Sequence, residues 1–545
     1  KENHPNLMYD KTVDAAKVCA SYDKVVQTLK ARRAMDLVPV VMEEMGDFLA
    51  ANGSSRLASA TYSDALDQLF GALRVVENWR QVLQGADPIQ LLGVPQLLRA
   101  VVLLYKVAAF PPSKADIFRS EQCARLCSQL VLPILKYTMP HPTRAIDFLA
   151  SYEANFLWPG GDLLLEKQVP PLEQITIALL FLADQLLQVD ASVAALPLAA
   201  LAELIASKYL RSAKLTLAAR LSRAEGMIRS HRFGAALSCL LSIYGGTALP
   251  REGLGEEFPL PPAREIDPEV LTAVFDDASP SLGAQAAALA ALQAAHLPPD
   301  VTQWMESGMM IRYDGLRALF CCAVGETDPM GGLMAVLKEP TVGEGAPIPA
   351  KGGKAAPAKG GAPAAAGTSE ASSAAFLQAA WQIAVEIPTR IAASCEGELD
   401  PRRMEALQAV VLEVEGRVRV ANGDVVAAVE CERRLIQAIQ ASDAAPRSPV
   451  PSELPWLSAP GLRDVLRSRA RQAELLGSKT RLPEALEQCR LGMKESEHQH
   501  DVHHAHVFTL LTAELEAANG NGAASEVSLM QLAKELDQQL QLRDS

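Results

Sequence analysis

Aromatic residues are scarce in this sequence. Phenylalanine, tryptophan and tyrosine make up 5% of its 545 residues, although 49% of the residues are hydrophobic. β-Sandwiches and β-barrels build their cores from aromatic and β-branched residues, so this composition argues against both. The apolar content is carried instead by alanine, leucine and valine. Because alanine and leucine lead the helix scale, and alanine lets two helices approach closely, we predict an all-α protein.

Positive charge is also in short supply. The chain has 51 lysines and arginines against 64 acidic residues, a formal net charge of −13. An acidic chain is not drawn to nucleic-acid phosphates or to an anionic membrane surface. The most apolar stretch, Leu97–Phe110, is interrupted by Arg99 and Lys106 and is shorter than the roughly 18 residues a membrane span needs. We therefore expect neither nucleic acid nor a membrane among the partners.

The nine cysteines are scattered and odd in number, so they form no disulfide framework. Such usage is typical of a reducing compartment. Cys123 and Cys127 share one helical face, but no second pair completes a metal site. Cys321 and Cys322 are adjacent, a spacing that rarely bridges. We expect all four to be small core hydrophobes.

Motifs of catalysis are missing as well. The chain has no GxxxxGK[ST] phosphate loop, no GxGxxG after a strand and no GxSxG elbow. Gly352, Gly353 and Lys354 resemble the end of a phosphate loop but lack its upstream glycine. The adjacent carboxylates Glu43 and Glu44 are interpreted as a solvated face. We expect no enzyme, no cofactor, and no catalytic, cofactor-binding or metal-ligating residue.

Histidine is concentrated in one place. Five of the nine histidines fall within nine residues: His498, His500, His503, His504 and His506. On a helix, His500 would share a face with His503 or His504, and Asp501 could add an oxygen ligand for Zn²⁺ or Cu²⁺. No HExxH pattern accompanies them. The favoured interpretation is a solvated start to a helix that continues as Val507–Ala517.

A low-complexity segment divides the chain. Residues Glu339–Ser373 are rich in proline, glycine and alanine, carry Lys351, Lys354 and Lys359, and have no large apolar residue after Ile348. Such a segment cannot offset its ordering entropy by burial, which predicts a disordered basic linker. The expected organisation is an N-terminal helical block over residues 1–338, the linker over 339–373, and a C-terminal helical block over 374–545.

On both sides of this linker the apolar residues recur with helical spacing. The repeating positions are Leu37, Val41, Met45 and Phe48; Leu66, Leu69, Leu73 and Val76; Ile175, Leu179, Leu182 and Leu186; and Leu407, Val411, Val414 and Val418. Gly53 and Gly423, each followed by a serine or aspartate, stand where helix ends and the next N-caps belong.

The helices are predicted to form pairs. A tetratricopeptide unit sets a small residue of its first helix against an alanine of its second, about twelve positions later. Gly416 with Ala428, Ala224 with Ala236, and Ala473 with Ala485 have this spacing, and Gly46 with Ala65 follows it across a longer loop. The sequence thus favours an α-solenoid of degenerate tetratricopeptide-like pairs. Unrelated helical bundles fit the same composition.

Two stretches resemble a known family. Met42–Leu83, which contains YSDALDQLFGAL and ends in NWRQVL, and Ala178–Pro250, which contains FLADQLL and LAARLSRAEGMIRSHRFGAALSCLLSIYGGTALP, are similar to the cilia- and flagella-associated protein fifty-four family. The resemblance implies a very long helical scaffold on the C1 side of the axonemal central apparatus, in the cytoplasm, cytoskeleton and cilium axoneme. It further implies a large hetero-complex with other central-apparatus and microtubule-associated proteins, and no catalysis. This chain, which starts at Lys1, is then a piece of a longer protein.

Two functions follow as hypotheses. The first is a non-catalytic structural scaffold of a ciliary axoneme assembly that organises its neighbours through lateral helix surfaces and supports motility. The second is a soluble helical-repeat adaptor that captures peptide segments in trafficking or signalling. Peptide-binding arrays line their grooves with asparagine, lysine or arginine at repeating positions. Here the corresponding positions, Arg419, Met227 and Leu476, are mixed, which favours the scaffold.

Overall fold

Helices form all the regular structure in the part of the chain that can be described. The computed structural model describes residues 15–83, 87–110, 117–138, 169–189, 191–230, 232–245, 307–325, 377–387, 401–443, 462–498, 501–519, 529–536 and 538. None of these residues lies in a β-strand. The all-α prediction is therefore confirmed.

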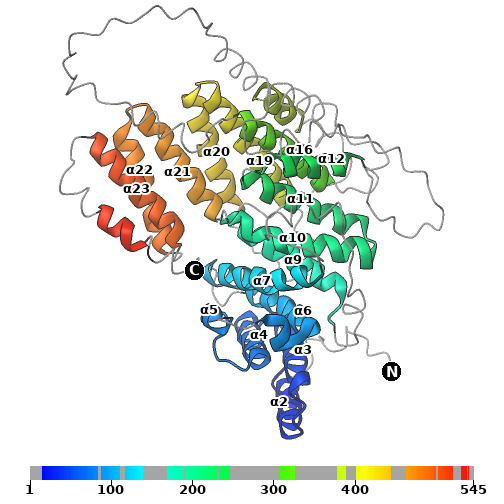
Figure 1. Ribbon diagram of the computed structural model, residues 1–545. Helices are drawn as coiled ribbons and strands as arrows, with labels where there is room; N and C mark the ends of the chain where they lie inside the picture. The colour runs from blue at the N-terminus through cyan, green and yellow to red at the C-terminus, as the bar shows by residue number, and fades with distance from the viewer. Residues whose placement is uncertain are drawn as a thin grey trace, which may run out of the picture.

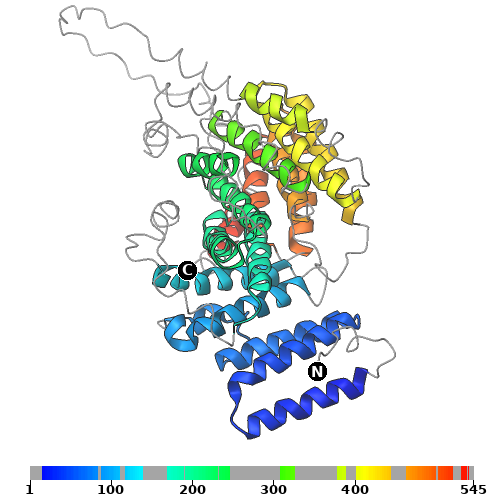
Figure 2. The ribbon, with the colours of Figure 1, turned by 90° about the vertical axis from the view of Figure 1, so that its right-hand side faces the viewer.

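The helices follow one another as packed neighbours. They are α2 (Ala15–Ala31), α3 (Val38–Ala51), α4 (Ser55–Phe70), α5 (Trp79–Val82), α6 (Pro88–Ala109), α7 (Ile117–Thr138), α9 (Leu172–Gln188), α10 (Ser192–Leu204), α11 (Ala213–Arg229), α12 (Phe233–Gly245), α16 (Ser307–Gly325), α19 (Pro401–Ala421), α20 (Val425–Asp443), α21 (Leu462–Ser478), α22 (Leu482–His498) and α23 (Val502–Ala518), with short η1 (Met35–Leu37) and η3 (Ile205–Leu210) turns. Most successive helices lie side by side in an array (Figure 1). Figure 2 shows α2, α3 and α4 stacked at one end of it.

The four predicted helix pairs are present as α3–α4, α11–α12, α19–α20 and α21–α22. Their small residues lie where the helices meet: Ala65, Ala224, Ala236, Ala428, Ala473 and Ala485 are fully buried. Gly53 and Gly423 end α3 and α19 with φ of 76°. That left-handed conformation suits glycine, and it confirms the predicted helix ends. Asp424 then caps α20 by accepting from the Ala427 N–H.

Three glycines lie where paired helices face each other, and at two of them the close approach depends on the missing side chain. A Cβ added to Gly46 would lie 2.6 Å from Tyr62 Cδ1, and one added to Gly492 would enter the ring of Phe508. A Cβ on Gly416 would lie 3.5 Å from the Glu432 side chain, which is ordinary contact. In each case the facing residue follows the glycine by sixteen positions, so three helix pairs repeat one packing geometry. The tetratricopeptide register itself stays a prediction.

Helix α4 is shorter than the periodicity indicated. The spacing of Leu66, Leu69 and Leu73 predicts a helix that continues past residue 73, but α4 ends at Phe70 and Leu73 is 82% exposed. The reason is local. Gly71 adopts φ of 60°. The two carboxylate oxygens of Asp67 then accept from the backbone N–H groups of Arg74 and Val75, at 2.8 Å each.

The core crosses the position of the predicted linker. The largest cluster of buried apolar side chains begins at Leu49 in α3 and includes Ala379, Val414 and Val418. A further contact joins the blocks, because Arg467 of α21 donates to the carbonyl of Gln188 at the end of α9, at 2.8 Å. Residues 339–373 lie outside the described residues, so the linker and the block boundaries stay predictions.

Helix α6 packs against α4, α7 and α9 in this core. It is long and apolar enough to cross a membrane, yet 72% of its most apolar window is buried inside the array. Arg99 and Lys106, which interrupt its apolar surface, both pair with Glu43 of α3. Its apolar side chains therefore serve as core for the neighbouring helices.

Overpacking tests the helix pairs. Ala236→Leu and Ala428→Leu each insert a larger side chain at a fully buried contact, and we expect each to cost about 1–3 kcal/mol of unfolding free energy. Gly416→Leu should behave likewise. Urea unfolding followed by circular dichroism measures the loss, with Val426→Leu at a 72% exposed position of α20 as the control. Unchanged midpoints in all three variants would refute the proposed contacts.

Candidate interaction site

A network of buried and half-buried charges fixes α4 against α3 and α6. Lys106 of α6 donates to Glu43 and to Asp47 of α3, each at 2.7 Å, and Arg99 donates to Glu43 at 2.8 Å. Tyr62 of α4 donates its hydroxyl to Asp47 at 2.8 Å. Because each charge has an opposite partner at hydrogen-bond distance, the network is stable in spite of its burial.

The expectation for Glu43 was wrong. The adjacent carboxylates predicted a solvated face, but only Glu44 is exposed, while Glu43 is buried and holds two cations. The two side chains differ because residues one apart on a helix point in directions about 100° apart. Glu43 therefore faces α6 and Glu44 faces solvent.

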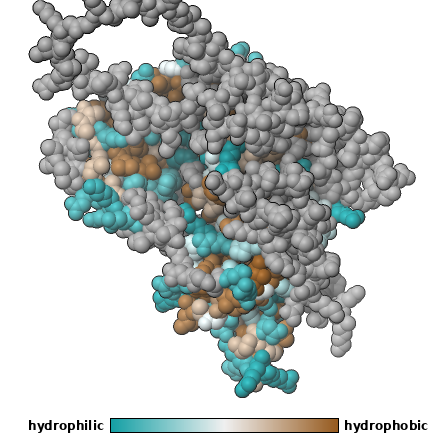
Figure 3. All heavy atoms as spheres, viewed as in Figure 1, coloured by the Kyte–Doolittle hydropathy of each residue, from teal (hydrophilic) through white to brown (hydrophobic). Residues whose placement is uncertain are grey.

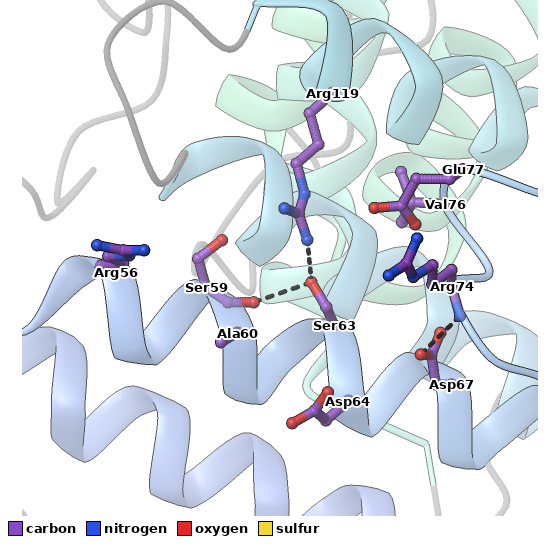
Figure 4. Close-up of a pocket in the computed structure, with 10 residues that line it drawn as sticks. All are labelled: Arg56, Ser59, Ala60, Ser63, Asp64, Asp67, Arg74, Val76, Glu77 and Arg119. Carbon is purple, nitrogen blue, oxygen red and sulfur yellow. Dashed lines mark hydrogen bonds between the residues drawn. The ribbon is translucent and has the colours of Figure 1, made fainter.

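On the outer side of α4 lies a polar pocket of about 260 Å³ (Figure 4). Three segments contribute to it: α4, the connection that follows it, and the first turns of α7. The lining residues are Arg56, Ser59, Ala60, Ser63, Asp64, Asp67, Arg74, Val76, Glu77 and Arg119. The α4 members recur at three- and four-residue spacing, which places them on one face of the helix.

Some polar groups of the pocket already make hydrogen bonds within the protein. Asp67 is used by the backbone of Arg74 and Val75. Arg119 donates to the hydroxyl of Ser63, and that hydroxyl donates to the Ser59 carbonyl at 2.9 Å. Burial, and then the neighbouring Asp67, raise the pKa of Asp64 above its ordinary value.

Further charge clusters join helices elsewhere in the array. Glu203 of α10 lies 2.8 Å from both Arg220 and Arg223 of α11. Glu225 of α11 pairs with Arg229 and with Arg312 of α16, at 2.8 Å each. Burial acts to raise the pKa of Glu225, but the two guanidinium groups outweigh it and hold the pKa below its usual range. These clusters connect α10 to α11 and α11 to α16.

The histidine cluster is divided by the structure. Helix α22 ends at His498 and α23 begins at Val502, while His500 lies outside the described residues. Asp501 caps α23 by accepting from the His504 N–H at 3.2 Å, and its other oxygen lies 3.0 Å from His504 Nδ1. The expected solvated start holds for His503, which is exposed, but His504 is buried.

No three histidine, cysteine, aspartate or glutamate side chains gather into a metal-binding group within the described ranges. Cys123, Cys127, Cys321 and Cys322 are all buried, as expected of core residues. Burial raises the pKa of the Cys321 thiol to about 12. These thiols therefore lie among the apolar side chains of α7 and α16.

The pocket was not predicted from the sequence. Arg56, Ser59, Ser63 and Asp67 do form a polar stripe at helical spacing, and such a stripe normally indicates an exposed face. What makes it a pocket is Arg119, fifty-six positions after Ser63. The stripe indicated a polar face on α4, but the residue of α7 that packs against it could not be identified without the fold.

The fold and these contacts define the chain as a helical-pair array whose polar residues bind helix to helix. No protein-family model matches it. It is a relative of proteins named Cilia- and flagella-associated protein 54, in agreement with the resemblance seen in its sequence. Identity is 29% over 254 residues with the Chlamydomonas reinhardtii protein, 26% over 226 with the Mus musculus protein and 24% over 239 with the Homo sapiens protein.

These matches cover 45%, 38% and 41% of this chain, but only 8%, 7% and 8% of the respective relatives. The matched region is therefore a small part of the length of these relatives. The relatives' names describe association with cilia and flagella.

Proposed function

We propose that this chain is a non-catalytic structural part of a ciliary axoneme assembly, within a projection of the central apparatus. The carrying observation is its similarity to three proteins named for their association with cilia and flagella. An elongated helical array supports the proposal because it offers a large outer surface for lateral contacts. The neighbours are other central-apparatus and microtubule-associated proteins in a large hetero-complex.

A tagged copy in ciliated cells tests this proposal. We expect it along the axoneme and resistant to low-salt extraction. Deleting Met42–Leu83 removes α4 and most of α3, so it should release specific companions and impair beating while the microtubules stay intact. Mass spectrometry of isolated axonemes identifies the lost companions, and re-expression of the intact chain is the control. Recovery of the intact chain as a freely soluble cytosolic monomer would contradict the proposal and support the adaptor.

A further inference from the structure

Four residues of the pocket between α4 and α7 supply two cations and two hydroxyl groups. Arg56 and Arg119 stand on either side of Ser59 and Ser63 in Figure 4. Asp64 points away from Arg119, Asp67 turns towards the Arg74 backbone, and Glu77 lies beside Arg74, across the pocket from Arg56. We refer to Arg56, Ser59, Ser63 and Arg119 as the basic half.

Two groups of the basic half have unused hydrogen-bonding capacity. Ser59 is 1% exposed, and its Oγ has no hydrogen-bond partner. Figure 4 shows this oxygen directed from α4 towards the space between Arg56 and Arg119. Arg56 is exposed, and its guanidinium makes no hydrogen bond or ion pair with any residue that the structure describes. A buried hydroxyl without a partner is unfavourable, so an acceptor placed here would relieve that cost.

We propose that the basic half binds the carboxylate of an aspartate or glutamate side chain presented by a neighbouring protein. Guanidinium groups bind carboxylates through paired N–H donors, and the Ser59 hydroxyl adds a further donor. A singly charged carboxylate fits better than a phosphate, because Asp64, Asp67 and Glu77 line the remainder of the same pocket and repel a dianion more strongly.

Size and surroundings indicate a protein segment as the source of this carboxylate. About 260 Å³ is below the usual volume of small-molecule sites but accommodates one acidic side chain. Leu57 and Leu73, adjacent in sequence to the arginines Arg56 and Arg74, are 59% and 82% exposed. Apolar surface is visible over the same end of the array in Figure 3. Because these leucines belong to the same two segments as the arginines, we expect the partner segment to carry apolar side chains as well as its acid. The site is then a docking point of the proposed scaffold, and the inference rests on that proposed function.

The test uses the 545-residue chain and a short fluorescent peptide of alternating leucine and glutamate, with binding followed by anisotropy. We expect Arg56→Gln to weaken binding about tenfold, since a charge-assisted hydrogen bond is lost. Ser59→Ala should weaken it about threefold without lowering thermal stability, because the hydroxyl has no partner in the free protein. Arg490→Gln, at a 72% exposed arginine of α22, is the matched control and should change binding less than about twofold.

Three results would overturn the inference. Equal weakening of peptide binding by Arg56→Gln and Arg490→Gln would show that the peptide is held by the overall charge of the chain and not by this site. Equal binding of the same peptide with glutamine in place of glutamate would show that the carboxylate is not the group that the site recognises. Displacement of the peptide by inorganic phosphate at lower concentration than by acetate would reassign the basic half to phosphate. None of these depends on where the protein resides, so a failure here is distinct from a failure of axonemal localisation.

Discussion

Replacing Glu203 by glutamine is expected to lower the unfolding free energy by about 3–5 kcal/mol. Glu203 is the carboxylate shared by two arginines of the next helix: Arg220 Nε lies 2.8 Å from one oxygen and Arg223 Nη1 lies 2.8 Å from the other. The three side chains are 3%, 6% and 2% exposed. Glutamine keeps the size of the side chain and removes its charge, so two buried guanidinium groups lose their shared counter-ion.

Urea unfolding of the intact chain measures this loss. The matched control is Glu430→Gln in α20. Glu430 and Arg433 form an ion pair at 3.0 Å, a similar distance, but their side chains are 54% and 52% exposed. Solvent screens that pair, so the control should change stability by less than about 1 kcal/mol. Equal effects of the two substitutions would show that the Glu203 cluster contributes no more than a surface ion pair.

Much of the fold could be predicted because its determinants are local in the sequence. Helical spacing of apolar residues identified α3, α9 and α19, and the positions of Gly53 and Gly423 just after periodic segments identified two helix ends. The pairs were predictable for the same reason: small residues such as Gly416 and Ala428 recur on either side of a short connection, although Gly416 itself faces Cys431 and Glu432. Short-range patterns of this kind need no knowledge of the distant chain.

The misinterpreted residues depend on distant neighbours. Glu43 is buried because Arg99 and Lys106 of α6 reach it, fifty-six and sixty-three positions later. Periodicity placed Leu73 in a helix, but α4 ends before it, where Asp67 accepts hydrogen bonds from the backbone of the connection that follows. The pocket likewise depends on Arg119 from α7. Sequence shows that such residues are charged or apolar, and only the fold shows what faces them.

The contact of Gly492 with Phe508 was also missed, because an aromatic partner sixteen positions later lies beyond the twelve-residue template. Both residues are buried where α22 meets α23, and any Cβ on Gly492 would overlap the Phe508 ring. The ring occupies the space that a side chain would need. Either the ring or the helices must move to admit a larger residue, and a close-packed interior resists both.

Gly492→Val is therefore expected to cost about 3 kcal/mol of stability, at the upper end of overpacking effects. Gly416→Ala is the matched control: its Cβ would meet Cys431 Cβ at 3.5 Å, so the gain in helix propensity of up to about 1 kcal/mol should dominate. Phe508→Leu should partly rescue Gly492→Val, because it removes the ring that clashes, and a double-mutant cycle measures that coupling. Additive effects of the two substitutions would show that the helices separate without strain, and that glycine at position 492 does not set the distance between α22 and α23.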